Sequence, residues 1–235
     1  MGIKERQERD RETVRRAILD AAKDLFESEG YANVSIRKIA ERIEYSPAAL
    51  YSYFPSKDDI FFALAHEGFE LLNAGSAQPG FADTPPQTRL DQLRESVWRI
   101  YQFSYDHPQY FALMFLDRDV PRVSKADECI AAARQGKDQL CALVQECIDA
   151  GDFPASLSPE VAMRLLTVGL VGIAALRISH RLAERERPDA LARDLLDVTI
   201  AGLRAGLPLR AYSFEEWPME FPAAPPAHSS PSQTS

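Results

Sequence analysis

SIRKIAERIEYSPAALYSYFPSKDD, the stretch from Ser35 to Asp59, holds three serines, Ser35, Ser46 and Ser56, that each precede a run of helix-forming residues. Serine is a preferred N-cap because its hydroxyl accepts a hydrogen bond from a backbone N–H of the first helical turn. Pro47 follows Ser46 at a position where a helix tolerates proline, and Pro55 stops that helix before Ser56 starts the next. The stretch therefore predicts two short helices and the start of a third.

Two short helices separated by a brief break, here at Glu44-Tyr45, are typical of a helix-turn-helix. In this motif the second helix enters the major groove of DNA with its N-terminal end first. Pro47, Ala48 and Ala49 are small enough to let the helix start approach base edges, and their apolar surface suits thymine methyl groups. These residue types predict a DNA-binding head.

Phosphate contacts are expected around the same short helix. The hydroxyls of Tyr51 and Tyr53 can reach phosphates, although both rings could instead pack the core of the head. The free N–H groups of the helix capped by Ser56, with Lys57 beside them, offer another phosphate site.

The rest of the chain shows helical periodicity and no sustained alternation of a strand, so the fold is predicted to be all α. Further helices are expected over Leu90–Tyr105, Pro108–Leu116, about Ser124–Ala150, Pro159–Leu182 and Pro188–Leu203. The expected divisions are a flexible charged arm (1–12), a helix-turn-helix DNA-binding domain (13–58), a linking helix (59–74), a larger ligand-binding and dimerisation domain (75–207) and a disordered Pro/Ser-rich tail (208–235).

The formal net charge of −8 conceals two mildly basic segments. Residues 1–16 carry six basic and four acidic side chains, and residues 30–57 carry four basic and two acidic ones. Because phosphate affinity depends on local clusters of Lys and Arg, the average charge does not exclude DNA binding. Arg15 and Arg16 could reach the minor groove or phosphates, but the mixed charge of the arm equally fits a solvated segment.

Several other classes of protein are not expected. The four histidines are scattered, and no P-loop, G-x-S-x-G or H-x-x-x-H pattern indicates an enzyme or a metal site. Cys129, Cys141 and Cys147 lack C-x-x-C spacing and are expected to be free thiols. The apolar run Leu165–Leu176 is too short to span a bilayer, so we expect a cytoplasmic protein without a membrane partner.

The segments AILDAAKDLFESEGY, SIRKIAERI and SPAALYSYFPSKDDI, within residues 13–72, resemble the TetR family of bacterial transcriptional regulators. DHPQYFALMF, at Asp106–Phe115, is similar to a stretch in a subset of them. The resemblance implies a three-helix DNA-binding head, a linking helix, dimerisation through the last two helices and a ligand pocket among the others. It also places Arg37 where the family often has a base-reading arginine, so Arg37 is our first candidate for a guanine contact.

One departure from the family pattern lies in the turn, where many members have glycine and this chain has Glu44. Glu44 must either adopt a costly left-handed conformation or change the geometry of the turn. The predicted DNA contacts are Ser35, Arg37, Lys38, Ser46, Pro47, Ala48, Ala49, Tyr51, Ser52, Tyr53 and Lys57. Arg37 and Lys38 could alternatively be solvated helix surface.

The segment Pro159–Leu182 is apolar almost all round, which is typical of a helix buried by its own domain and by a partner. With the last predicted helix it suggests a four-helix dimer interface, although a purely internal core helix would have the same composition. The predicted interface residues are Val161, Leu165, Val168, Gly169, Gly172, Leu176, Leu195 and Val198.

A ligand pocket is predicted from an aromatic-rich set on two successive helices and from residues on the helices that should face it. An ordinary core would look the same. The candidates are Trp98, Tyr101, Tyr105, Phe111, Met114, Phe115, Cys141, Met163 and Thr167. Because no buried charge cluster is apparent, we expect an apolar or aromatic ligand.

These observations predict a homodimeric regulator, acting as a repressor, that binds double-stranded DNA at a palindromic operator and is released by a small-molecule effector. No other cofactor is expected. The alternatives are a thiol-responsive regulator that uses Cys129, Cys141 and Cys147, and an activator that requires its ligand.

Overall fold

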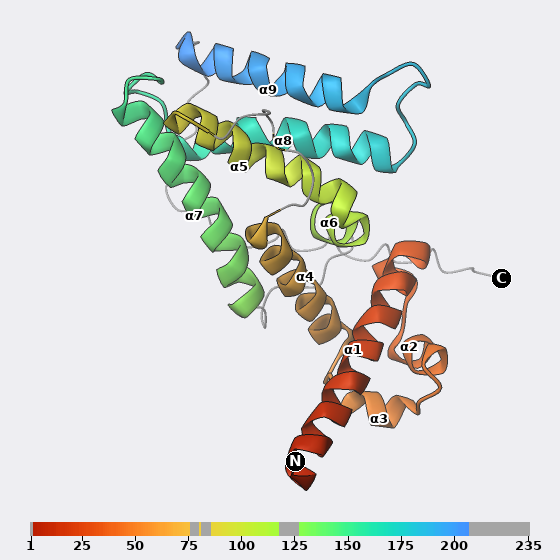
Figure 1. Ribbon diagram of the computed structural model, residues 1–235. Coiled ribbons are helices and arrows are strands. Elements are labelled where there is room, and N and C mark those ends of the chain that lie inside the picture. The colour runs from red at the N-terminus through yellow and green to blue at the C-terminus, as the bar shows by residue number, and fades with distance from the viewer. Residues whose placement is uncertain (1, 76–79, 81–85, 118–126, 207–235) are drawn as a thin grey trace, which may run out of the picture.

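The computed structural model describes residues 2–75, 80, 86–117 and 127–206, and every regular element within these ranges is a helix. The predicted all-α fold is therefore confirmed. The helices are α1 (Ile3–Glu29), α2 (Ile36–Arg42), α3 (Pro47–Tyr51), α4 (Lys57–Ala74), α5 (Arg89–Asp106), α6 (Pro108–Phe115), α7 (Asp127–Asp149), α8 (Pro159–Ile178) and α9 (Pro188–Arg204), with a 3₁₀ turn at Tyr31–Asn33. Figure 1 shows α1–α3 as a small head, α5–α9 as a larger body, and α4 running between the two.

The head packs around an apolar cluster in which Ile18 of α1, Ile39 of α2 and Leu50 of α3 are fully buried. These positions belong to the apolar stripes of their helices, so burying them fixes how the three short elements face one another. The predicted N-caps form as expected on Ser35 for α2, Ser46 for α3 and Ser56 for α4.

The N-terminal arm, expected to be flexible, is helical, because α1 already begins at Ile3. Its mixed charges are spaced to stabilise a helix. The Glu5 carboxylate accepts a hydrogen bond from the Gly2 N–H at 3.0 Å, and Arg15 pairs with Glu12 at 3.5 Å. The alternating signs that suggested a solvated arm instead support the first turns of α1.

The turn between α2 and α3 holds Glu44 in the left-handed conformation, with φ at 59°. The Tyr45 N–H donates to the Ala40 carbonyl at 2.9 Å, and the Glu44 N–H donates to the Glu41 carbonyl at 3.3 Å. This pair of bonds is the Schellman pattern that normally ends a helix at glycine. Of the two expected alternatives, the structure shows the left-handed one.

α8 ends four residues earlier than the sequence predicted, at Ile178 rather than Leu182. His180 adopts φ of 54°, and the Arg181 N–H donates to the Leu176 carbonyl at 2.9 Å. A second Schellman turn therefore closes α8, again without glycine. Periodicity alone could not place this end because the apolar pattern continues beyond it.

Within the described residues, α8 alone is long and apolar enough to cross a membrane, judged by length and composition. The apolar run Leu165–Leu176 is too short to span a bilayer, but the whole of α8 is long enough. Leu166, Leu170 and Ile173 are nevertheless buried in the protein core. A core helix meets the same criterion, so the composition of α8 is weak evidence for a membrane span. The predicted disordered tail, 208–235, lies outside the described residues.

Candidate DNA interface and ligand cavity

The start of α3 is open to solvent. Pro47 and Ala48 are exposed and Ala49 is half-buried, whereas Leu50 is fully buried. Tyr51 is 55% exposed, so its ring projects from the head rather than packing the core. One short helix therefore anchors itself through Leu50 and presents its small residues and one tyrosine outward.

The other end of α3 lies against α1. The guanidinium of Arg11 donates to the Ser52 carbonyl at 3.2 Å and lies 5.5 Å from the centroid of the half-buried Tyr53 ring. Arg15 lies 5.3 Å from the centroid of the Phe54 ring. These contacts hold the end of α3 on α1. Two of the N-terminal arginines, Arg11 and Arg15, therefore make contacts within the head.

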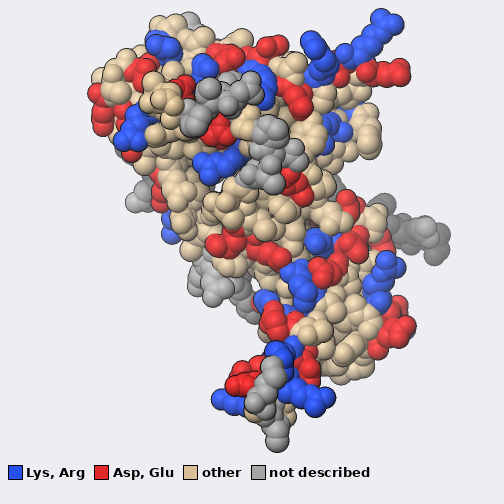
Figure 2. Space-filling view, in the orientation of Figure 1, with Lys and Arg blue, Asp and Glu red and all other residues tan. Residues whose placement is uncertain are grey.

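The basic candidates differ in how freely they can meet DNA. The Arg37 side chain is 80% exposed and pairs with Glu41 at 2.9 Å. Lys38 is exposed but is held to α1 by an ion pair. The half-buried Lys57 ammonium donates to the Tyr31 carbonyl at 2.8 Å. Of the predicted contacts, Ser35, Arg37, Lys38, Ser46, Pro47, Ala48, Tyr51 and Ser52 are exposed, and Ala49, Tyr53 and Lys57 are half-buried. Figure 2 shows basic and acidic side chains interspersed at the lower, head end of the molecule.

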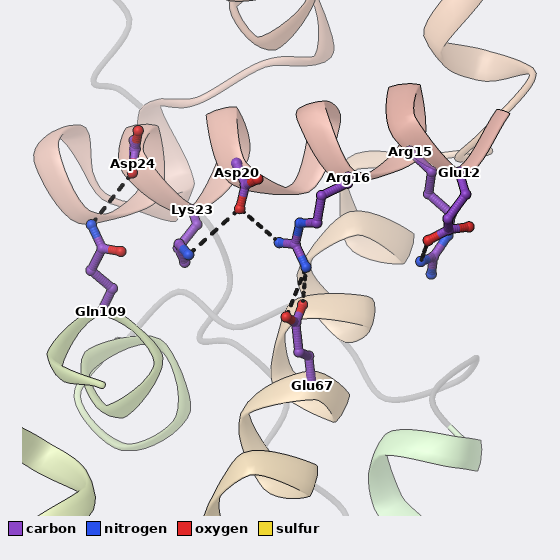
Figure 3. Close-up of polar contacts among 8 residues, drawn as sticks. All are labelled: Glu12, Arg15, Arg16, Asp20, Lys23, Asp24, Glu67 and Gln109. Carbon is purple, nitrogen blue, oxygen red and sulfur yellow. Dashed lines mark hydrogen bonds and ion pairs between the residues drawn. The ribbon is translucent and has the colours of Figure 1, made fainter. Parts of the chain in front are cut away.

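A polar junction joins the head to the body. Arg16 of α1 donates to both carboxylate oxygens of Glu67 of α4, at 2.7 and 2.8 Å, and to Asp20 at 2.9 Å. Lys23 lies 3.6 Å from Asp20 and 4.8 Å from the ring centroid of Tyr110 on α6. Figure 3 shows the polar contacts that join Glu67, Arg16, Asp20 and Lys23 along α1. Arg16 was a candidate for a DNA contact, but its side chain binds Glu67 and so connects α1 to α4.

A cavity of about 800 Å³ lies between α4, α5, α7 and α8. This volume is within the usual range for small-molecule sites. Its lining is mostly apolar and consists of Phe69, Leu72, Asn73, Ser96, Arg99, Ile100, Phe115, Ala133, Gly136, Lys137, Gln139, Leu140, Ala142, Leu143, Glu146, Met163, Arg164, Thr167, Val168 and Val171. Phe115, Met163 and Thr167 were among the sequence candidates.

The predicted aromatic residues of α5 lie on the face opposite the cavity. The hydroxyls of Tyr101 and Tyr105 donate to Asp189 at 2.9 and 2.6 Å, and Arg193 lies 4.6 Å from the centroid of the Trp98 ring. Burial raises the pKa of Tyr101 above its ordinary value, so its hydroxyl remains a donor. These residues fasten α5 to α9. The other three candidates outside the lining are Phe111, Met114 and Cys141.

The charged and amide residues of the cavity were not anticipated from sequence. Asn73, Arg99, Lys137 and Arg164 come from four different helices. Asn73, Arg99 and Arg164 each stand among mainly apolar neighbours in the sequence, and Lys137 stands in a polar run, so none of the four indicates a shared cavity. Only the packing of α4, α5, α7 and α8 shows that they share one space.

Apolar side chains are exposed along α8 and α9. They are Leu165, Val168, Leu176, Leu191 and Val198, and Val198 is 69% exposed. A Cβ at Gly172 would meet no atom within 4 Å, so this glycine is open to an approaching surface. A Cβ at Gly169 would lie 2.4 Å from Leu195, so these two residues pack together within the chain. Val161, in the first turn of α8, is half-buried.

The cysteine environments disfavour a reactive thiolate. Cys147 is fully buried, and burial raises the pKa of its thiol to about 11. Burial also raises the pKa of Cys141. The side chain of Cys129 lies outside the described part of the structure. Among the described residues, no group of three or more His, Cys, Asp or Glu side chains is placed to hold a metal ion.

Two family models match the chain. Residues 18–64 match the model described as bacterial regulatory proteins of the tetR family, and residues 93–199 match the tetracyclin repressor-like C-terminal domain. The first match covers the head from residue 18 onward and the start of α4, and the second covers most of the body. The segment that joins α4 to α5 lies between the two matches.

Curated relatives are transcriptional regulators. The repressor KstR of Mycolicibacterium smegmatis is 32% identical over 88 residues, which are 37% of this chain and 43% of KstR. The activator FasR of the same organism is 27% identical over 164 residues, 70% of each chain. YuxN of Bacillus subtilis, an uncharacterised regulator, is 22% identical over 52% of this chain and 41% of its own. The match thus spans less than half of KstR and YuxN.

Solved structures share the fold. A Rhodococcus protein of unknown function aligns with a TM-score of 0.63 and 23% identity, over 81% of this chain and 95% of its own. FadR of Bacillus subtilis, solved with stearoyl-CoA, aligns with a TM-score of 0.63 and 16% identity, over 79% and 97%. At these identities the likeness concerns the arrangement of helices.

Proposed function

The chain belongs to the TetR family of bacterial regulatory proteins, and from that premise we propose that it is a homodimeric, sequence-specific DNA-binding repressor controlled by a small-molecule effector. A regulatory protein of this family is not an enzyme. The proposed divisions are residues 13–58 for DNA, 59–74 for the link, and 75–207 for ligand and dimer. As a DNA-binding regulator it would act in the cytoplasm.

The exposed start of α3 is the observation that carries the DNA-binding proposal. Ser46, Pro47 and Ala48 are exposed although Leu50 buries the helix firmly in the head. A short helix with a small, open N-terminal end fits the major groove, where its backbone can come close to base edges. Arg37, 80% exposed at the start of α2, would add a guanine contact.

The exposed apolar residues of α8 and α9 support the homodimer. A two-fold axis would bring the same face of a second copy onto Leu165, Val168 and Gly172, forming a four-helix bundle. Gly169 and Leu195, predicted for the interface, would support it from behind by fixing α9 on α8. Two heads related by this axis would read a palindrome.

The cavity supports effector control because α4 borders it and also touches the head. Phe69, Leu72 and Asn73 of α4 line the cavity, and Glu67 of the same helix binds Arg16 of α1. A ligand that shifts α4 would change the spacing of the two heads. It can release DNA only through its different affinities for the two states, commonly about 1–3 kcal/mol of coupling.

Selection of the purified full chain against random DNA duplexes at moderate salt tests the proposal. We expect enrichment of a palindrome whose half-sites lie about one helical turn apart. The control is the Leu50→Asp chain, in which the head is unpacked. Failure to enrich any sequence, from wild-type protein shown to be folded and dimeric, with and without cell extract, would refute the DNA-binding proposal.

The position of the operator relative to a promoter decides between repressor and ligand-dependent activator, and the relative FasR is named an activator. A promoter–reporter assay with the selected operator separates the two, since deletion of the regulator raises expression for a repressor and lowers it for an activator. The high pKa of Cys147 gives the thiol-responsive alternative no support.

A further inference from the structure

The cavity lies where α5 and α7 diverge from a shared contact. Arg89 at the start of α5 pairs with Glu146 near the end of α7 at 3.0 Å. Arg99 and Gly136 are each ten residues from that ion pair, which is about 15 Å along either helix. Figure 1 shows the two helices separating from this end. Arg99 on one wall and Lys137 on the other therefore stand at the same depth of the cavity.

Asn73 of α4 lies at the same depth of the cavity as Arg99 and Lys137. A Cβ at Gly136 would lie 3.2 Å from the Asn73 Oδ1, so the amide meets α7 directly beside Lys137. Its Nδ2 is buried and has no hydrogen-bond partner among the described residues. An unsatisfied buried donor costs about 1–3 kcal/mol, so this amide favours a ligand that brings an acceptor.

The lining has an excess of positive charge. Among the described lining residues, Arg99, Lys137 and Arg164 are cationic and Glu146, which pairs with Arg89, is the one carboxylate. Lys137 also interacts with the carboxylate of Glu160, which lies outside the lining. Arg99 donates to the neutral Ser96 hydroxyl at 3.0 Å, which leaves its charge uncompensated by that bond. A site of this kind favours an anion and disfavours a cationic ligand.

We propose that the effector is an amphipathic organic acid whose carboxylate binds at the level of Asn73, Arg99 and Lys137 and whose apolar body fills the rest of the cavity. Phe69, Leu72 and Phe115 supply apolar lining for that body. This inference rests on the proposed function, since it names the ligand class of the same cavity. It also gives the ligand a direct hold on α4, through Asn73.

Calorimetry on the whole chain tests the inference by measuring the affinities of compounds that share an apolar body and differ only in the head group. Octanoate, 1-octanol and octylamine form one set, and 4-phenylbutanoate with 4-phenylbutanol forms a second. In at least one set we expect the acid to bind at least about tenfold more tightly than its alcohol, with the octylamine affinity lowest in its set. In Arg99→Gln/Lys137→Gln the acid should lose this advantage while the alcohol keeps its affinity.

Arg134→Gln is the matched control, because Arg134 is exposed on the same helix and outside the lining. Circular dichroism and the midpoint of thermal unfolding show whether each variant is folded. Equal affinities of acid and alcohol for the wild type, or no acid binding below about 1 mM, would overturn the inference. Acid binding by a protein that selects no DNA would instead overturn the regulatory function and leave the ligand class standing.

Discussion

Glu44 shows how a family-wide turn can be built without glycine. Its φ of 59° carries a steric cost of roughly 1–3 kcal/mol for a residue with a side chain, yet both Schellman bonds form. The head accepts that cost because Leu50 and the Ser46 cap fix where α3 must start. The geometry of the turn is therefore set by the packing of α3 rather than by the turn residue.

Replacement of this residue by glycine should stabilise the protein. Glu44→Gly removes the left-handed strain but adds backbone entropy to the unfolded chain, so we expect the free energy of unfolding to rise by about 1 kcal/mol. Glu41→Gly is the control, since Glu41 is helical and exposed, and it should lose about 1 kcal/mol. Urea unfolding followed by circular dichroism measures both. A destabilised Glu44→Gly would show that the Glu44 side chain contributes contacts that outweigh its strain.

Arg37 carries the most specific prediction about DNA. Arg37→Ala should weaken binding to the selected operator by about 1–3 kcal/mol, or roughly 5- to 150-fold, and relax the preference at one base pair. Lys57→Ala should instead weaken all sequences alike and flatten the salt dependence, as expected for a phosphate contact. Fluorescence anisotropy with single-base operator variants measures both.

The Lys57 variant needs a check of folding, because its ammonium also donates to the Tyr31 carbonyl inside the head. The midpoint of thermal unfolding of the isolated protein provides it. If Arg37→Ala bound every operator variant like the wild type, the docking of α2 and α3 proposed here would be wrong.

At the scale of the helices, the starts were predictable and the ends and faces were less so. The starts of three helices could be predicted from Ser35, Ser46 and Ser56, because an N-cap bond joins residues that are close in sequence. The end of α8 was missed because it depends on His180 adopting a left-handed conformation that no local residue demands. The helical start of α1 was missed because charge pairs within it were interpreted as solvation.

The outward residues of α3 could be predicted for the same reason, since the motif is contiguous in sequence. The cavity could not. Whether Tyr101 faces a ligand or α9 is decided by Asp189, which lies 88 positions further along the chain. Arg99, two residues earlier in α5, faces the cavity because that bond turns the aromatic side of the helix toward α9.

The exposed face of α8 and α9 leads to a prediction about assembly. Val198→Asp should raise the dissociation constant of the dimer at least about tenfold, because an unpaired carboxylate would be buried between two copies. Val198 is 69% exposed in the single chain, so the substitution should leave the protomer folded. Analytical ultracentrifugation measures the assembly, with Ala131→Asp on the exposed side of α7 as the control. A dimer of unchanged affinity would place the interface elsewhere.

At the scale of the whole molecule, an effector can control DNA binding only if its binding to the body is energetically coupled to DNA binding by the head. α4 is the connecting element, since Asn73 lines the cavity and Glu67 holds Arg16 of the head. The Arg16–Glu67 bond is a charge-assisted, two-point contact that has one favoured geometry. Movement of α4 should therefore be transmitted to α1 rather than absorbed.

Glu67→Gln should loosen this connection while the side chain keeps its shape. Operator affinity without effector should change by less than about threefold, whereas the factor by which effector weakens operator binding should fall markedly from its wild-type value, commonly about 5–150-fold. Glu12→Gln is the control because Glu12 pairs with Arg15 inside α1, as Figure 3 shows, and joins no second domain.

Reciprocity makes this prediction strict. Whatever factor the effector imposes on operator affinity, the operator must impose on effector affinity, so both should fall together in Glu67→Gln. Anisotropy titrations of operator with and without effector, and calorimetric titrations of effector with and without operator, give the two factors independently. If Glu67→Gln and Glu12→Gln kept the wild-type factor alike, the signal would have to reach the head by another contact, such as the one between Lys23 and Tyr110 of α6.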